Sequence, residues 1–173
     1  MSATEGIAQV STFATQYSLT AWNFAGDFLI IIVLVSVLFI YGWYVGRGPF
    51  VAILLALYAG YAIYAAFPYT SLLPTAPALT ALLAQAGVYL GLVFLFFIIL
   101  RRVVVSDFLY VGIFGLIALS FFATAFLLAL AYQVFPVAPI YHFTLPIDLL
   151  FAPKEYFFWW FIAPAVGLFF LAR

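Results

Sequence analysis

Cysteine is absent from this chain of 173 residues, histidine occurs once, and only 6% of the residues are charged. Without thiols the chain forms no disulfide bond and offers no thiolate ligands to a metal ion. The five basic residues are balanced by five acidic ones, so the net charge is zero. Nucleic-acid-binding domains carry a basic surface that so few cations do not provide. These absences argue against a disulfide framework, a thiolate metal site and a nucleic-acid partner.

Apolar residues, by contrast, make up 70% of the chain, where soluble domains have roughly 45 to 50%. A soluble fold of this length has too little interior to bury so much apolar surface, so lipid must act as the solvent. The apolar residues lie in long runs, as a helix that crosses a bilayer requires. We expect one all-α domain: a polytopic transmembrane helical bundle of four to five spans, preceded by an N-terminal interfacial helix.

A turn signal separates the first two apolar runs. The stretch 41–50 reads YGWYVGRGPF, in which Arg47 stands between two glycines and shortly before Pro49. Glycine lets the backbone turn sharply, and a helix that precedes a proline stops before it. We therefore expect spans over residues 26–46 and 49–67, joined as a hairpin whose basic tip lies in water.

The rest of the chain predicts three more spans and two interfacial segments. Four prolines in the segment before the last apolar run prevent a straight spanning helix, so we expect an interfacial or re-entrant segment there. The last run contains Pro164, and it either crosses with a kink or stays near the interface. Apolar residues at helical spacing predict an interfacial helix at the N-terminus. The spans are 78–100, 107–135 and 156–172, and the interfacial segments are 1–23 and 136–155.

Polar residues mark two of the predicted helix starts. Asp27 stands at the entrance of the first span, where a carboxylate suits the positive end of the helix dipole, and we expect it only to begin the helix. For the span over 107–135 we expect Ser106 to be the N-cap residue and Asp107 to be an acidic residue in the first helical turn.

The basic residues predict the orientation in the membrane. With five crossing helices, Arg47, Arg101, Arg102 and Arg173 would fall on one side of the bilayer, and only Lys154 on the other. Cytoplasmic loops of membrane proteins carry the excess of positive charge. We therefore expect an integral membrane protein with arginine-rich cytoplasmic tips that contact anionic lipid and with the N-terminus outside.

Small residues at four-residue spacing predict two helix-packing faces. Ala52, Ala56 and Gly60 form one on the second span, and Gly87 and Gly91 form a GxxxG pair on the third. Small side chains let helices approach closely, which is how helices associate in lipid. We expect the chain to assemble with itself or with other membrane subunits.

Candidate chemistry is sparse. No predicted span has an ionisable group near its middle, as a proton or ion pathway would require. His142, the single histidine, is the one candidate cofactor ligand, because an imidazole can ligate haem or chlorophyll. The sequence contains no zinc-protease motif and no serine elbow. We expect no catalytic residue, no metal site and no cofactor beyond bound lipid, with pigment or haem at His142 left open.

Tyrosines recur at three-residue spacing on the second span, at Tyr58, Tyr61 and Tyr64. Such a stripe can bind an aromatic cofactor or a sugar. Bulky tyrosines more often fill a bundle interior while their hydroxyl groups bond to carbonyl oxygens.

Several of these features occur in a characteristic order. An acidic residue opens the first span, a Gly-Arg-Gly turn leads into a span rich in Ala and Gly, and a later apolar span ends in basic residues before a polar helix start and further small residues. The residues are Asp27, Gly46, Arg47, Gly48, Ala52–Ala66, Arg101, Arg102, Ser106, Asp107, Gly112, Gly115 and Ala118. Over about residues 27–135 this order resembles the colicin V production protein (CvpA) family of small bacterial inner-membrane proteins. Residues 116–120 are uncharged here, whereas the family has an arginine in the corresponding turn.

The resemblance implies an inner-membrane protein linked to envelope function or export, without established enzymatic activity. We accordingly expect a non-enzymatic protein that acts through helix–helix assembly. One alternative is a small subunit of a larger membrane enzyme or energy-converting complex that binds pigment, quinone or haem with His142 as a ligand. A second alternative is an oligomeric channel for a small solute.

Overall fold

The computed structural model describes residues 25–69, 73–103, 111–135, 137 and 139–171. This part of the chain forms six helices and no strand, which confirms the expected all-α fold class. Four helices are long and apolar enough to cross a membrane, as expected of an integral membrane protein: the N-terminal helix (Ala25–Tyr44), α2 (Arg47–Ala65), α3 (Ala78–Val103) and α4 (Ile113–Gln133). They are followed by α5 (Leu145–Phe151) and α6 (Lys154–Leu171). The predicted interfacial helix over residues 1–23 lies outside the described residues.

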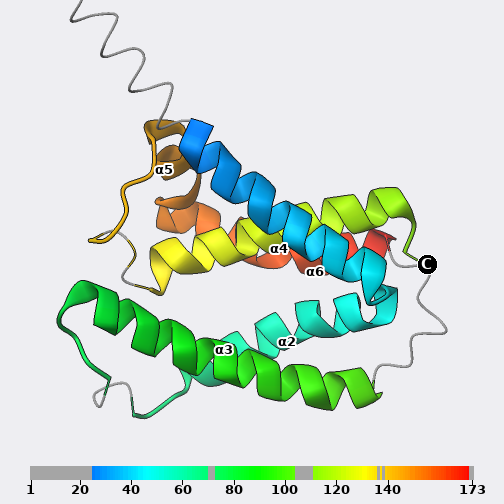
Figure 1. The fold of residues 1–173 in the computed structure, drawn as a ribbon, viewed down its shortest axis with the longest axis horizontal. Coiled ribbons are helices and arrows are strands. Elements are labelled where there is room, and N and C mark those ends of the chain that lie inside the picture. The colour runs from blue at the N-terminus through cyan, green and yellow to red at the C-terminus, as the bar shows by residue number, and fades with distance from the viewer. Residues whose placement is uncertain (1–24, 70–72, 104–110, 136, 138, 172–173) are drawn as a thin grey trace, which may run out of the picture.

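Successive long helices run back and forth along the bundle (Figure 1). α2 packs against α3, and α4 packs against α6. The N-terminal helix packs on α4, since a Cβ atom added at Gly42 would lie only 2.6 Å from Leu116 Cδ1. The bundle thus consists of two helix pairs, with the N-terminal helix in contact with α4.

The two ends of the bundle differ in charge. The start of α2, the end of α3 and the start of α4 lie at one end (Figure 1), which we call the arginine end because Arg47 begins α2 and Arg101 and Arg102 lie in the last turn of α3. α5 and the starts of the N-terminal helix and α6 lie at the opposite end, the α5 end. The described acidic residues, Asp27, Asp148 and Glu155, all belong to these elements of the α5 end.

The first hairpin turns at Gly46, ahead of Pro49. Gly46 has a φ angle of 113°, a left-handed conformation that glycine adopts without steric cost. α2 therefore begins at Arg47 rather than at residue 49 as predicted. Pro49 lies in the first turn of α2, where its missing N–H removes no helical hydrogen bond.

The predicted span over 107–135 is too long at its N-terminal side. α4 begins at Ile113, and its N-cap Gly112 is extended, with φ −63° and ψ 168°. A helix cannot continue through an extended residue, so α4 has 21 residues, close to the length that crosses a bilayer core. Ser106 and Asp107, the predicted N-cap and first-turn charge, lie outside the described residues.

The proline-rich segment over 136–155 contains a helix that the sequence did not predict. α5 spans seven residues, and Pro146 occupies its first turn, where proline fits a helix well. α6 then runs as an 18-residue helix through the buried Pro164. α6 is not among the four long apolar helices, so the crossing of a fifth span stays a prediction.

α2 and α3 pack closely together at Gly60. A Cβ atom added there would lie 2.7 Å from Val93 Cγ2 and 3.2 Å from the Val93 backbone nitrogen. Ala52 and Ala56 on the same stripe are fully buried. At Gly87 and Gly91, by contrast, an added Cβ would have no atom of the described structure within 4 Å. The α2 stripe therefore packs inside the chain, whereas the GxxxG pair of α3 faces outward.

Replacing Gly60 with alanine is expected to destabilise the fold by about 1 to 3 kcal/mol, because the new methyl group collides with Val93. The measurement is unfolding of the purified protein by SDS in mixed micelles. Gly26→Ala adds the same methyl group to the N-terminal helix in open space, and it should leave stability unchanged or slightly higher. Equal stability of the two variants would contradict the close contact.

Candidate functional site

Asp27 does more than begin a helix. It is 1% exposed, and its carboxylate accepts hydrogen bonds from the Tyr141 hydroxyl (2.5 Å) and from the Thr144 backbone N–H (2.6 Å). The hydrogen bond to Asp27 raises the pKa of the Tyr141 phenol, because ionisation would break this bond and put a second negative charge beside the carboxylate. The carboxylate therefore ties the segment between α4 and α5 to the N-terminal helix.

A second carboxylate is held in a similar way. The Tyr132 hydroxyl, near the end of α4, donates to Asp148 Oδ1 of α5 at 2.5 Å. The Gln133 side chain donates to the carbonyl oxygens of Phe151 (3.2 Å) and Ala152 (2.7 Å). These bonds hold α5 against the end of α4.

Aromatic rings connect these two attachments. The Phe143 ring lies 4.7 Å from the Tyr141 ring, at an interplanar angle of 76°, and 5.4 Å from the Tyr132 ring. Phe151 continues the series with contacts to Tyr132 and to Trp160 of α6. Edge-to-face and tilted ring pairs of this kind add stability beyond the area they bury.

The candidate ligand His142 lies in the same region. Its side chain is exposed, and it lines a cavity of about 320 Å³ between the end of α4 and α5. Tyr132, Tyr141, Phe143 and Asp148 line the same cavity. Within the described residues, no three His, Asp or Glu side chains are grouped so that they could hold a metal ion. The cavity is thus aromatic and acidic, and nothing in it favours a metal centre over an organic ligand.

The tyrosine stripe of α2 lies between the two helix pairs. Tyr58 stacks on Phe126 at 5.0 Å and donates its hydroxyl to the Phe161 carbonyl oxygen at 2.5 Å. Tyr61 contacts the Phe161 ring, and Tyr64 contacts the ring of Tyr89. These side chains belong to the packed core of the bundle, as the interior interpretation of the stripe requires.

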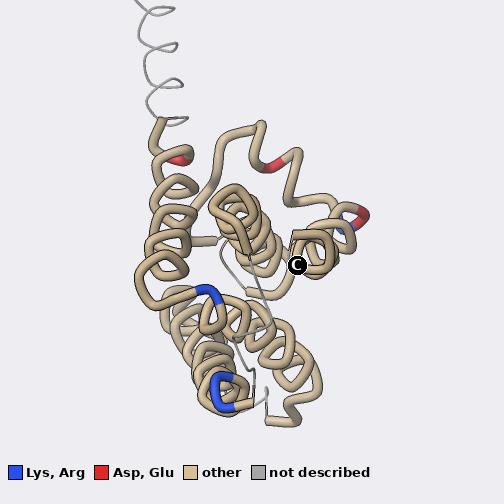
Figure 2. Tube along the Cα trace, turned by 90° about the vertical axis from the view of Figure 1, so that its right-hand side faces the viewer, with Lys and Arg blue, Asp and Glu red and all other residues tan. Residues whose placement is uncertain are grey.

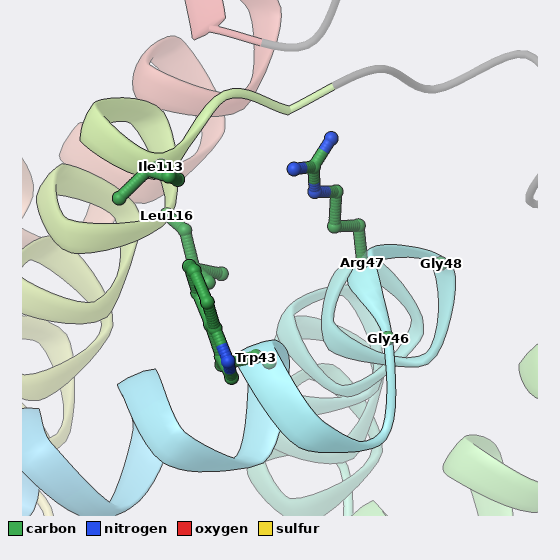
Figure 3. A pocket seen from close by; sticks show the side chains of 7 residues that line it. Trp43, Gly46, Arg47, Gly48, Ile113 and Leu116 are labelled. Carbon is green, nitrogen blue, oxygen red and sulfur yellow. The ribbon is translucent and has the colours of Figure 1, made fainter.

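A second cavity, of about 420 Å³, opens at the arginine end. Figure 3 shows Arg47 extending from the start of α2 across this space, with Trp43 on the side of the N-terminal helix. Neither α2 nor α4 has a side-chain N-cap or an acidic residue in its first turn. Among the described residues, two helix N-termini and the Arg47 guanidinium contribute positive charge to this region. Figure 2 looks onto this end and shows that the lysine and arginine positions do not form a single cluster.

An apolar groove of about 330 Å³ runs between the N-terminal helix, α4, α5 and α6. Thr124 is its one hydroxyl-bearing residue, and that hydroxyl donates to the Ser120 carbonyl oxygen at 2.9 Å. The groove therefore has no polar group that a ligand must satisfy, and its chemistry matches that of the surrounding hydrocarbon. The main lining residues are Phe28, Ile31, Phe121, Ala125, Leu128, Ile147, Leu150, Phe151 and Trp160.

The residues predicted from the sequence are thus distributed over four regions, of which the buried stripe of Ala52, Ala56 and Gly60 on α2 is one. The arginines share one end of the bundle, His142 lies near the other, and Gly87 and Gly91 lie on the outer side of α3. The Asp27 and Asp148 attachments were not predicted, because their partners lie far away in sequence or outside any recognisable motif. Comparison with protein-family models, with curated protein sequences and with solved structures found no match.

Removing the charge of Asp27 is expected to loosen the segment before α5. Asp27→Asn keeps the shape, but its amide cannot accept both hydrogen bonds, each worth about 1.5 to 3 kcal/mol when one partner is charged. Hydrogen exchange of the Thr144 amide should therefore accelerate by at least about tenfold. Tyr141→Phe removes one of the two bonds and should have a smaller effect. Unchanged exchange in Asp27→Asn would show that the attachment does not hold the segment.

Proposed function

We propose that this chain is a non-enzymatic protein of a bacterial inner membrane that acts by helix–helix assembly, in the manner expected from its resemblance to the CvpA family, with a role in envelope function or export. The partner we propose is a second copy of the chain. The observation that carries the proposal is the outer face of α3, which we call the glycine face: Leu83, Gly87, Gly91 and Phe94.

The glycine face lies on the side of α3 turned away from α2. Tyr89 and Val93 face α2, where Tyr89 donates a hydrogen bond to the Leu57 carbonyl oxygen at 3.2 Å and Val93 meets Gly60. With 3.6 residues per turn, Gly87 and Gly91 then point away from that contact. Leu83 and Phe94, which flank the glycines, are 64% and 65% exposed.

The shape of this face suits another helix. The two glycines leave a shallow depression between bulky side chains, and a partner backbone can approach closely there. Lipid removes the hydrophobic drive between helices, so such close approach is the main source of association energy in a membrane. Since a bilayer orients all copies alike, two copies related by an axis along the membrane normal would pack their α3 helices in parallel through the same face.

The charge distribution supports the proposed orientation. The arginine end combines three arginines with the uncapped N-termini of α2 and α4, and cytoplasmic loops favour positive charge. We therefore place the arginine end in the cytoplasm, where it meets anionic lipid headgroups. The α5 end, with Asp27, Asp148 and Glu155, then lies on the outer side.

Gly87→Leu and Gly91→Leu are expected to convert the oligomer to monomers without lowering the stability of the monomer, because each added side chain fills the depression but meets no atom inside the chain. Native mass spectrometry in mild detergent gives the oligomer size. Gly26→Leu is the matched control, since Gly26 also has open space around its position but lies outside the glycine face. Unchanged oligomer size in both α3 variants, or a wild type that is monomeric, would refute the proposal.

A further inference from the structure

We propose that the cavity at the α5 end binds an organic ammonium group, supplied by a lipid headgroup or by a free solute. Its walls combine aromatic rings with a carboxylate: Tyr132, Tyr141, Phe143, His142 and Asp148. Aromatic faces and a carboxylate are the groups that recognise substituted ammonium ions. This inference is independent of the glycine face and of the assembly it mediates.

The rings are fixed before any ligand arrives. Tyr141 stands nearly at right angles to Phe143, at 76°, and Tyr132 lies on the other side of Phe143 at 5.4 Å. Both phenol hydroxyls are held by carboxylates, Tyr132 by Asp148 and Tyr141 by Asp27. Donation to a carboxylate makes a phenol ring richer in electrons, which strengthens the attraction of its face for a cation. The side chains of the site therefore lose little conformational entropy when a ligand binds.

The charges around the cavity favour a cation. Asp148 uses Oδ1 to accept the Tyr132 hydrogen bond, and its other oxygen has no hydrogen-bond donor among the residues that the structure describes. No lysine or arginine lines the cavity. Gln133 turns its NH₂ group towards the carbonyl oxygens of Phe151 and Ala152, which leaves its own carbonyl oxygen as an acceptor. An anionic ligand would meet the Asp148 carboxylate and no lysine or arginine on these walls.

The size of the cavity favours an organic cation over a metal ion. About 320 Å³ lies at the lower end of the range for small-ligand pockets, roughly 300 to 1,000 Å³. A bare ion would need several oxygen or nitrogen ligands around it, and the described residues offer no group of three. The cavity also lies where the N-terminal helix begins and α4 ends, the level at which two candidate spans would reach lipid headgroups.

Calorimetric titration of the full chain in detergent, with choline as the probe, tests this site. Choline should bind, whereas neohexanol, its uncharged isostere, should bind at least about tenfold more weakly. Asp148→Asn is expected to weaken choline binding by about tenfold, because it removes the charge but keeps an acceptor for Tyr132. Phe143→Leu should weaken it by about two- to fivefold. Glu155→Gln, which removes a charge from the same end but outside the cavity, should bind as the wild type does.

Native mass spectrometry from phosphatidylcholine nanodiscs then distinguishes the two sources of the ammonium group. A retained lipid that choline displaces, and that Asp148→Asn loses, assigns the site to a headgroup. Choline binding without retained lipid assigns it to a free solute. The proposal is overturned if neither choline nor phosphatidylcholine binds, if neohexanol binds as tightly as choline, or if Asp148→Asn binds as the wild type does. The comparison of choline with neohexanol uses only the wild type, so it stands even if a variant fails to fold.

Discussion

The close approach of α2 and α3 at Gly60 is the constraint on which the rest of the structure depends. Because Gly60 has no side chain, Val93 packs directly against the α2 backbone there, and Tyr89, about one turn earlier on α3, also faces α2. That contact fixes the rotation of α3 about its own axis, and it leaves Gly87 and Gly91 on the outer side. A larger residue at position 60 would separate the helices and remove the reason for this rotation. The proposed assembly surface thus follows from a packing contact inside the chain.

The two ends of the bundle are built by different physical means. At the α5 end, two carboxylates accept hydrogen bonds from tyrosine hydroxyls and hold a short helix against the ends of longer ones. Carboxylates at the boundary of a membrane are costly to bury unless they are bonded in this way. At the arginine end, a cavity opens at the glycine turn and is lined by Arg47 at the start of α2 and by Ile113 at the start of α4. In the orientation proposed above, this asymmetry puts the aromatic and acidic groups on one side of the bilayer and the three arginines on the other.

The sequence predicted the fold class well, because long apolar runs and the Gly-Arg-Gly turn are local patterns. In a bilayer such patterns correspond directly to helices and to the turn between them. It placed the start of α4 wrongly, since a continuous apolar run does not show that Gly112 is extended. It missed α5, because prolines indicate a break but do not reveal a short helix between them. The bonds of Asp27 cross 114 and 117 residues of sequence, and no local pattern indicates a partner so far away. Gly60 and Gly87 illustrate the same limit: both have neighbouring small residues at four-residue spacing, and only the structure shows which stripe is buried.

The central claim is that the outer face of α3 mediates contact between copies, and disulfide cross-linking in native membranes tests it most directly. The chain has no cysteine, so a single introduced cysteine reports one position. With two copies packed in parallel through the glycine face, Leu83→Cys and Phe94→Cys should give cross-linked dimers under mild oxidation. Val37→Cys, on the exposed side of the N-terminal helix, should give few or none. Efficient cross-linking at position 37, with none at positions 83 and 94, would contradict the account.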